Sequence, residues 1–438
     1  MQYLPNILFV IALIAGLGFF AMNIRKIFRN INLGKSIDRT NNKPERWKNM
    51  IKIALGQSKM VKRPFSGFLH IVVYLGFVII NIEVLEIIID GILGTHRIFQ
   101  GFIGTDLYAF LIGTFEILAA LVFIAVILFW TRRNIANIKR FLSLEMKGWP
   151  KMDGNIILYF EMVLMTLFLV MNATDAPFQN VGIGNPVSQF IAPTFDGFSF
   201  EALHVIERSA WWIHILGILV FLNYLFYSKH LHILLAFPNT FFANLNVKGQ
   251  FNNLESVTKE VKLMMDPDAD PYAAPLEGAE EEVPEKFGAS DVLDLNKMQL
   301  LNAYTCTECG RCTSACPANL TGKKLSPRKI MMDTRDRLEE VGRNIDTNGG
   351  TFKDDGKQLL NDYISPEELW ACTSCNACVE ECPINIDPLS IIMDMRRYLV
   401  MEESAAPQEL NAMMSNIENN GAPWQYNQQD RLNWANEE

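Results

Sequence analysis

Cysteine is absent from most of this 438-residue sequence and concentrated in one short region. None occurs before Cys306 or after Cys382, and the eight between these limits are the whole set. Several are spaced only two residues apart. Such neighbours cannot pair with one another without strain, because a disulfide requires a specific separation and direction of its Cα atoms. The pattern argues against a disulfide framework and favours metal binding in a reducing compartment.

The sequence also has no excess of positive charge and no nucleotide-binding motif. Its formal net charge is -9, whereas a nucleic-acid partner requires a basic patch. It contains no G-x-G-x-x-G in a Rossmann setting, no flavin motif and no cysteine left over for a substrate-active cluster. We therefore expect no nucleic-acid partner and no catalytic residue in this chain, and electrons must enter from another polypeptide.

Charged residues are scarce in five apolar segments of the first half. Each segment approaches the ~20 residues with which a helix crosses a hydrocarbon core of ~30 Å. The first has no basic region before it and no small-residue cleavage site after it, so we expect it to remain as a span. The five spans are expected near residues 5–23, 67–90, 106–130, 155–173 and 205–232.

The charges of the connecting loops predict the orientation of these spans. Residues 25–63 carry 12 Lys and Arg against two acids, and residues 131–153 carry six against two. Residues 91–105 contain only Arg97, and residues 174–204 contain neither Lys nor Arg. Because Lys and Arg accumulate on the cytoplasmic side, we expect a multi-pass protein of a bacterial cytoplasmic membrane, with the N-terminus outside and the cysteines in the cytoplasm.

Histidines in the apolar half are candidate haem ligands. A neutral imidazole is a usual axial ligand of haem iron, and two on different helices clamp a haem between them. His70 begins the second span at the depth of His232, which predicts a haem b between these two on the cytoplasmic side. His230 competes with His232 for this role. All six histidines lie in this half, at positions 70, 96, 204, 214, 230 and 232.

His214 is the candidate for a second, outer haem. It precedes His232 by 18 residues, which on one continuous helix gives a shared face and a separation of ~27 Å. At the matching depth the second span offers no second histidine. We therefore expect one haem b, and a second would require His96 or His204 from the outer loops. The alternative for His96, His204 and His230 is that an interfacial histidine only reaches toward water.

Two copies of one cysteine motif are the most specific pattern in the chain. In such runs the first three thiolates hold one 4Fe-4S cubane and the fourth binds the other cluster. This predicts Cys306, Cys309, Cys312 and Cys382 on one cluster, and Cys372, Cys375, Cys378 and Cys316 on the second. Zinc is the competing interpretation, but a four-ligand zinc site explains the doubled motif less economically. Each copy reads C-x-x-C-x-x-C-x-x-x-C-P, over residues 306–317 and 372–383.

The predicted fold is all-α, a five-helix transmembrane bundle followed by an α-helical dicluster ferredoxin domain. Helices are expected at Ser326–Val341 and Pro388–Met401, after start signals containing proline. An acidic, Pro-rich stretch, residues 266–291 with Glu280, Glu281 and Glu282, predicts a solvated linker. The expected domains are the haem b domain 1–237, an acidic cytoplasmic linker 238–293, the ferredoxin domain 294–402 and a polar tail 403–438.

The apolar half resembles the nitrate reductase gamma family and the related membrane subunits of heterodisulfide reductases. The resemblance rests on the five spans, on His70 within residues 66–70 (SGFLH), and on the histidines ending in residues 228–232 (SKHLH). It implies a quinol-oxidising haem b protein. In two-haem members the second helix carries two histidines, and only the one equivalent to His70 is present here. The cysteine half resembles the ferredoxin domains of heterodisulfide reductase and succinate dehydrogenase.

These features predict a membrane subunit that passes electrons between a cytoplasmic redox partner and the quinone pool. Asn81, Glu83 and Glu86 are candidates for contact with a quinone or exchange of its protons, with structural roles as the alternative. The resemblance implies a Cys-rich catalytic subunit of the heterodisulfide reductase type, or an electron-transfer flavoprotein route to menaquinone. The competing classes are a membrane redox sensor and a non-haem anchor for a cytoplasmic iron-sulfur complex.

Overall fold

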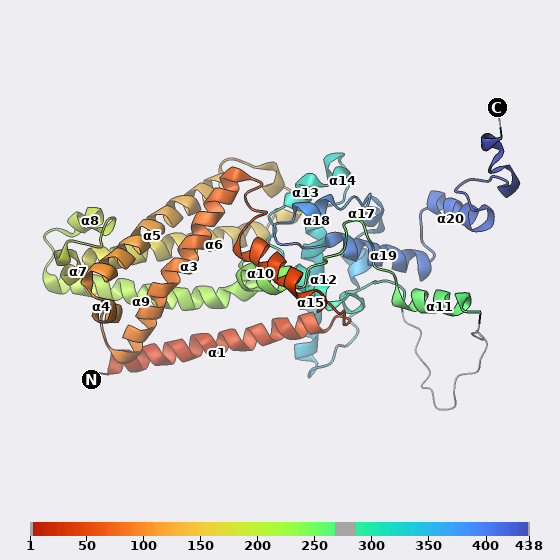
Figure 1. The fold of residues 1–438 in the computed structure, drawn as a ribbon. Coiled ribbons are helices and arrows are strands. Elements are labelled where there is room, and N and C mark those ends of the chain that lie inside the picture. Colours follow the sequence, from red (N-terminus) through yellow and green to blue (C-terminus); the bar gives the residue numbers. More distant parts are fainter. Residues whose placement is uncertain (1–2, 268–285, 437–438) are drawn as a thin grey trace.

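The computed structural model describes residues 3–267 and 286–436, and within these ranges the regular elements are helical. The prediction of an all-α fold is confirmed. Figure 1 shows the long helices of the first half lying roughly side by side, with the shorter helices of the cysteine region packed at one end of them. Glu280, Glu281 and Glu282 of the predicted linker lie outside the described residues.

Five helices are long and apolar enough to cross a membrane. They confirm the number of predicted spans, although most extend several residues beyond the predicted ends. α6 packs on α9 and α5, α3 packs on α5, and α1 packs on α9 and α3. Their bounds are α1 Leu4–Asn32, α3 Pro64–Leu93, α5 Thr105–Asn134, α6 Trp149–Thr174 and α9 Phe200–Tyr224.

Short helices connect the long ones at both ends of the bundle. On the side of the cysteine region, α2 continues into a π-helical turn at Ile51–Leu55. The opposite side carries α4, α7 and α8 (Figure 1). Their bounds are α2 Lys43–Met50, α4 Ile98–Ile103, α7 Ala176–Val181 and α8 Ser188–Ile191.

The predicted fifth span, residues 205–232, is wrong at its C-terminal end. α9 stops at Tyr224, short 3-10 turns occupy most of residues 225–231, and a new helix, α10 (His232–Phe241), begins at His232. His214 and His232 therefore lie on different helices. Their predicted shared face on one helix is wrong as well.

Side chains cap the backbone where α9 ends. Ser228 has an extended backbone, and its hydroxyl accepts the backbone N–H of His230 at 3.0 Å. Asp153 of α6 accepts the backbone N–H of Lys229 at 3.2 Å and the hydroxyl of Tyr224 at 2.7 Å. These acceptors take the place of helical carbonyls, so the chain can leave the helix without burying unpaired donors.

The cysteine region is built from short helices around two longer ones, α15 and α19. Ser326 caps α15 by accepting the backbone N–H of Lys329, as the start signal predicts, but the helix continues beyond Val341 to Thr347. α19 matches its predicted bounds. The helices of this region are α12 Lys297–Thr305, α13 Arg311–Ala315, α14 Pro317–Leu320, α15 Pro327–Thr347, α16 Leu359–Asp362, α17 Pro366–Trp370, α18 Ala377–Glu381 and α19 Pro388–Met401. α11 Glu255–Met265 and α20 Gln408–Asn420 lie outside these packed helices and have no buried residue (Figure 1).

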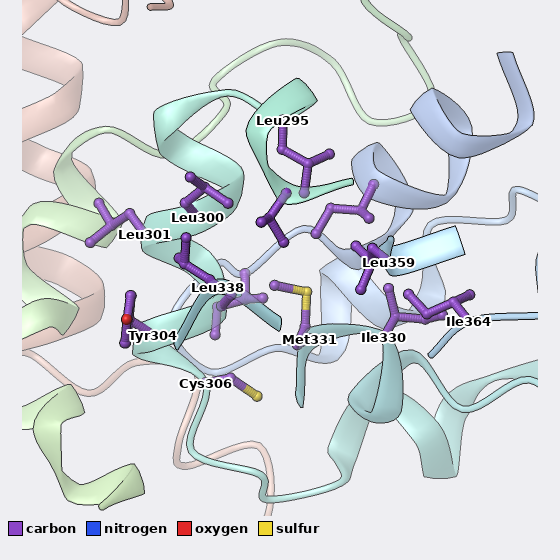
Figure 2. Packing of buried hydrophobic residues seen from close by; sticks show 14 of the residues in the cluster. Leu295, Leu300, Leu301, Tyr304, Cys306, Ile330, Met331, Leu338, Leu359 and Ile364 are labelled. Atoms are coloured by element: carbon purple, nitrogen blue, oxygen red, sulfur yellow. The ribbon is translucent and has the colours of Figure 1, made fainter. Parts of the chain in front are cut away.

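One apolar core joins the two halves. Ile27 and Ile31 at the end of α1, and Leu231 and Leu235 around the start of α10, belong to the same buried cluster as the helices of the cysteine region. Figure 2 shows the cysteine-region part of this core, with Cys306 at its edge. Because separating the halves would expose these side chains to water, burial of apolar area holds the cysteine region against the bundle.

A buried ion pair adds to this contact. The guanidinium of Arg328, on α15, is fully buried and donates to Glu145 in the α5–α6 loop at 2.7 Å. It also donates to the backbone carbonyl of Arg140 in the same loop at 2.7 Å. A buried cation that loses its counter-ion is strongly destabilising, so the pair constrains the position of this loop.

Replacing Glu145 with Ala should lower the free energy of unfolding of the cysteine region by about 3 kcal/mol, because Arg328 would remain buried without its carboxylate partner. Denaturant unfolding of the detergent-solubilised protein measures this change. The control is Glu367→Ala, which breaks the exposed pair with Lys324 and should cost about 0–1 kcal/mol. Equal losses in the two variants would contradict a docking role for the buried pair.

Candidate iron-sulfur and haem sites

The two cysteine motifs fold in the same way. In the first, Glu308 and Gly310 have left-handed backbones and α13 follows; in the second, Ser374 and Asn376 occupy the same positions and α18 follows. Residues with positive φ turn the chain sharply, so successive cysteines project from one tight loop. The sequence repeat therefore corresponds to a structural repeat.

The fourth cysteine of each motif lies beside the first three of the other. Cys382 interacts electrostatically with Cys306 and Cys309, and Cys316 does so with Cys372 and Cys378. α13 and α18 pack against each other, which brings the motifs together. This proximity is compatible with the predicted exchange of fourth cysteines, and the ligand sets stay a prediction.

We name the two sets by their positions. The membrane-side group contacts loops of the bundle, whereas the solvent-side group includes Cys375, the one cysteine with an exposed side chain in the described chain. The membrane-side group is Cys306, Cys309, Cys312 and Cys382. The solvent-side group is Cys316, Cys372, Cys375 and Cys378.

The thiols of the membrane-side group lie in a largely buried environment. Burial raises the pKa of Cys306 to about 12 and that of Cys382 to about 11, so iron must displace protons to bind these sulfurs. Among the described residues no three Cys, His or carboxylate side chains converge as the ligands of one metal ion would.

Cationic side chains surround the membrane-side group. The Lys59 ammonium donates to the backbone carbonyl of Cys382 at 3.2 Å, and Arg311 donates to the carbonyl of Lys59 at 3.0 Å. Burial lowers the pKa of Lys59 to about 8, which leaves it charged at neutral pH. Arg140 interacts with Cys309. In the sequence, Lys59 and Arg140 are visible only as loop charges.

Glu308 links the membrane-side group to the histidine loop. Its carboxylate, between Cys306 and Cys309 in sequence, pairs with Lys229 and, at 2.9 Å, with Arg335. Lys229 directly precedes His230. This buried pair ties the first cysteine loop to the segment that carries two candidate haem ligands.

Three of the candidate histidines gather at the end of the bundle that carries the cysteine region. The rings of His230 and His232 lie 5.4 Å apart between centroids, and His70 interacts electrostatically with both. Nδ1 of His232 faces the Lys229 carbonyl at 3.1 Å, which places its proton there and leaves Nε2 free to bind iron. Nδ1 of His70 is buried without a hydrogen-bond partner in the described chain.

The environment of His230 is different. Its Nε2 lies 3.9 Å from the Glu161 carboxylate, and its ring packs on Phe221 at 5.5 Å. Burial, together with the nearby imidazoles of His232 and His70, lowers the pKa of His230 to about 3. His230 is therefore a neutral ring beside the His70 and His232 pair.

The remaining histidines lie toward the opposite end. His214 is buried against α6, where its ring packs on Phe168 at 6.3 Å. Its Nδ1 has no partner in the described chain. Nε2 of His96 lies 3.1 Å from Asp175, and His204 is exposed.

A network of buried charges fills the far end of the bundle, and the sequence predicted only part of it. Arg97 bonds Asp175 at 2.7 Å and Tyr108 at 3.2 Å, and Tyr108 donates to Glu86 at 2.9 Å. A lone arginine in an apolar half, with acids inside the helices, is the signal that could have indicated it. Such charges persist in lipid only when they are paired.

Glu83 lies beside this network but is not fully satisfied by it. It is 3% exposed, and its Oε2 has no hydrogen-bond partner in the described chain. With Glu86 and Trp211 it lines a cavity of about 20 Å³, room for about one water molecule. Asn81 points outward and bonds the Phe77 carbonyl of its own helix.

Comparison with known proteins supports the cluster interpretation. Residues 305–386 match the family model described as a 4Fe-4S dicluster domain. No solved structure matches the chain.

Three relatives place this domain among redox proteins. A probable iron-sulfur-binding oxidoreductase, FadF, of Bacillus subtilis is 30% identical over 87% of this chain and 54% of its own. An EtfAB:quinone oxidoreductase of Syntrophomonas wolfei is 24% identical over 88% and 53%. A subunit of a CoB-CoM heterodisulfide reductase of Methanosarcina acetivorans is 31% identical over 27% and 60%.

The chain spans about half the length of the first two relatives. Their names describe oxidoreductases, and the third relative is named as an oxidoreductase subunit. The chain is therefore related to iron-sulfur oxidoreductases and their electron-transfer subunits, and its cysteine region is a 4Fe-4S dicluster domain joined to a bundle of five apolar helices.

Proposed function

We propose that this protein carries electrons between a cytoplasmic redox partner and the quinone pool, through two 4Fe-4S clusters and one haem b. The observation that carries the proposal is the position of the membrane-side cysteines, which contact the same end of the bundle as His70 and His232. When bound, these centres supply one-electron transfer, and the protein sets their positions and surroundings.

His70 and His232 fit the role of haem ligands. They come from different helices, α3 and α10, as a clamp requires. The hydrogen bond from Nδ1 of His232 to the Lys229 carbonyl holds the ring orientation, as the second bond of a metal-binding histidine does. The unpartnered Nδ1 of His70 is a buried polar atom that the protein leaves available. His230 remains the competing ligand, and His214 the candidate for a second haem.

Glu83 is the best candidate in this chain for a group that exchanges protons with quinone. A quinone reaction moves protons together with electrons, and water is scarce inside the bundle. The unpaired oxygen of Glu83 lies at the cavity beside Glu86, within reach of the charged network that leads to His96 at the surface. An intramembrane carboxyl with no counter-ion in contact is a functional candidate by default.

The proposal for the soluble partner rests on the cofactor motifs in this sequence and on the names of the related proteins. The described chain offers no flavin or nucleotide motif, so a partner must supply the electrons or take them up. The Syntrophomonas relative is named for an electron-transfer flavoprotein and quinone, and the Methanosarcina relative for heterodisulfide reduction. We propose an electron-transfer flavoprotein or a Cys-rich subunit of the heterodisulfide reductase type.

The ligand sets predict which single cysteine substitutions damage the same cluster. Cys316→Ala should remove the EPR signal that Cys372→Ala removes and leave the one lost in Cys306→Ala, because Cys316 lies with the solvent-side group. Iron should fall from about eight to about four per chain in each variant. Loss of the same signal in Cys316→Ala and Cys306→Ala would contradict the exchange of fourth cysteines.

Haem binding is tested by replacing its proposed ligands. His70→Leu and His232→Leu should each abolish the cytochrome b bands of a reduced-minus-oxidised spectrum while keeping about eight irons per chain in the clusters. Tyr74→Phe, one turn further along α3, should keep the bands. An unchanged cytochrome spectrum in either histidine variant would sink the assignment.

The role proposed for Glu83 predicts a slower reaction with quinol. Glu83→Gln keeps the shape of the side chain but cannot accept a proton, so reduction of the haem by a menaquinol analogue should slow about 100-fold. Stopped-flow absorbance at the haem band measures this rate. Glu201→Gln, at the exposed start of α9, is the control, and equal rates in Glu83→Gln and wild type would assign Glu83 a structural role.

A further inference from the structure

Two loops of the bundle lie against the membrane-side cysteine group. One is residues 56–63, between the π-helical turn and α3, and the other is residues 135–148, between α5 and α6. The first contributes Lys59 and the second contributes Arg140. Charge near a 4Fe-4S cluster is one of the factors that set its reduction potential, so these contacts carry a consequence for redox chemistry.

Lys59 is held in place from two sides. Its ammonium donates to the backbone carbonyls of Glu380 at 3.3 Å and Cys382 at 3.2 Å. Its own carbonyl accepts from Arg311 at 3.0 Å, the residue immediately before Cys312. Lys59 thus bridges the two motifs at the position where Cys382 joins the first three cysteines.

Arg140 lies over the first cysteine loop. Its strongest electrostatic interaction is with Cys309, and its backbone carbonyl accepts from Arg328 at 2.7 Å. Its Nε is buried and has no hydrogen-bond partner in the described chain. A buried cationic donor without an acceptor fits an anionic cluster with its thiolates beside it.

The solvent-side group has a different charge environment. Arg396 donates to the Leu369 carbonyl at 3.0 Å and interacts with Cys372. Asp387, which is half-buried, interacts with Cys378. Here one cation is offset by one anion, and both belong to the cysteine region itself. The anion beside the membrane-side group, Glu308, is instead paired with Lys229 and Arg335.

We infer that Lys59 and Arg140 raise the reduction potential of the membrane-side cluster, an inference that rests on the proposed function. Two loops of the bundle would thus adjust the potential of a cluster that the cysteine region binds. Neither side chain binds iron. They act by lowering the free energy of the reduced cluster, which carries one more negative charge than the oxidised one.

Burial of the membrane-side group acts in the opposite direction. Reduction adds negative charge where water is excluded, and that lowers a cluster's potential. Lys59 and Arg140 are themselves half-buried, so salt and solvent screen their attraction for the added electron less than they screen an exposed charge. Removal of either positive charge should therefore lower the reduction potential of the membrane-side cluster, because burial of the added negative charge would no longer be offset.

The test is an EPR-monitored redox titration of the full-length protein, purified anaerobically in detergent. Cys309→Ser and Cys375→Ser assign the two cluster signals. Lys59→Met should shift the reduction equilibrium of the membrane-side cluster about tenfold toward the oxidised form, which is ~59 mV for a one-electron couple, and leave the solvent-side cluster unchanged. Lys59→Arg should restore the potential.

Lys62→Met is the matched control, because Lys62 belongs to the same loop but pairs with the partly exposed Glu380 carboxylate at 2.7 Å. It should leave both potentials unchanged. Arg140→Met provides a second variant with the same expected shift, with iron content checked in each. If Lys59→Met and Arg140→Met keep both cluster signals and the potential of the membrane-side cluster does not move, the inference is wrong and the proposed function is unaffected. If the wild-type protein lacks two cluster signals, both the inference and the proposed function are wrong.

Discussion

The contact between the cysteine loops and the charged loops of the bundle is the constraint on which the rest of the structure depends. Its polar part is buried, with Arg328 on Glu145 and Lys229 on Glu308, and its apolar part is continuous with the end of α1. Buried charges need their partners in one geometry. The dicluster domain consequently has a defined position against the bundle, with one cysteine group beside the histidine loop and the other toward solvent.

Features set by local sequence could be predicted well. Five spans follow from apolar length alone, and α19 begins and ends where its proline and apolar spacing indicate. The match of residues 305–386 to a 4Fe-4S dicluster domain agrees with the clusters predicted from the repeated motif. The exchange of Cys316 and Cys382 between the motifs stays a prediction.

Features that depend on distant residues could not be predicted in the same way. α9 ends at Tyr224 because Asp153, from another helix, accepts backbone and side-chain donors there. The apolar pattern continues through this break, so hydropathy does not reveal it. Lys59 and Arg140 were visible only as loop charges, since their contacts with the cysteine groups are more than 160 residues away in sequence. His70 and His232 nevertheless come together, although His232 begins a separate helix instead of ending the fifth span.

Two clusters and one haem b in adjoining sites are the core of the proposed function, and a cryo-EM map of the anaerobically purified protein tests them most directly. We expect two cubane densities, one bound by Cys306, Cys309, Cys312 and Cys382, and a haem between His70 and His232 on the same side of the bundle. A map with zinc-like single-atom densities in the cysteine loops, or with His70 and His232 in contact only with protein atoms, would contradict this arrangement.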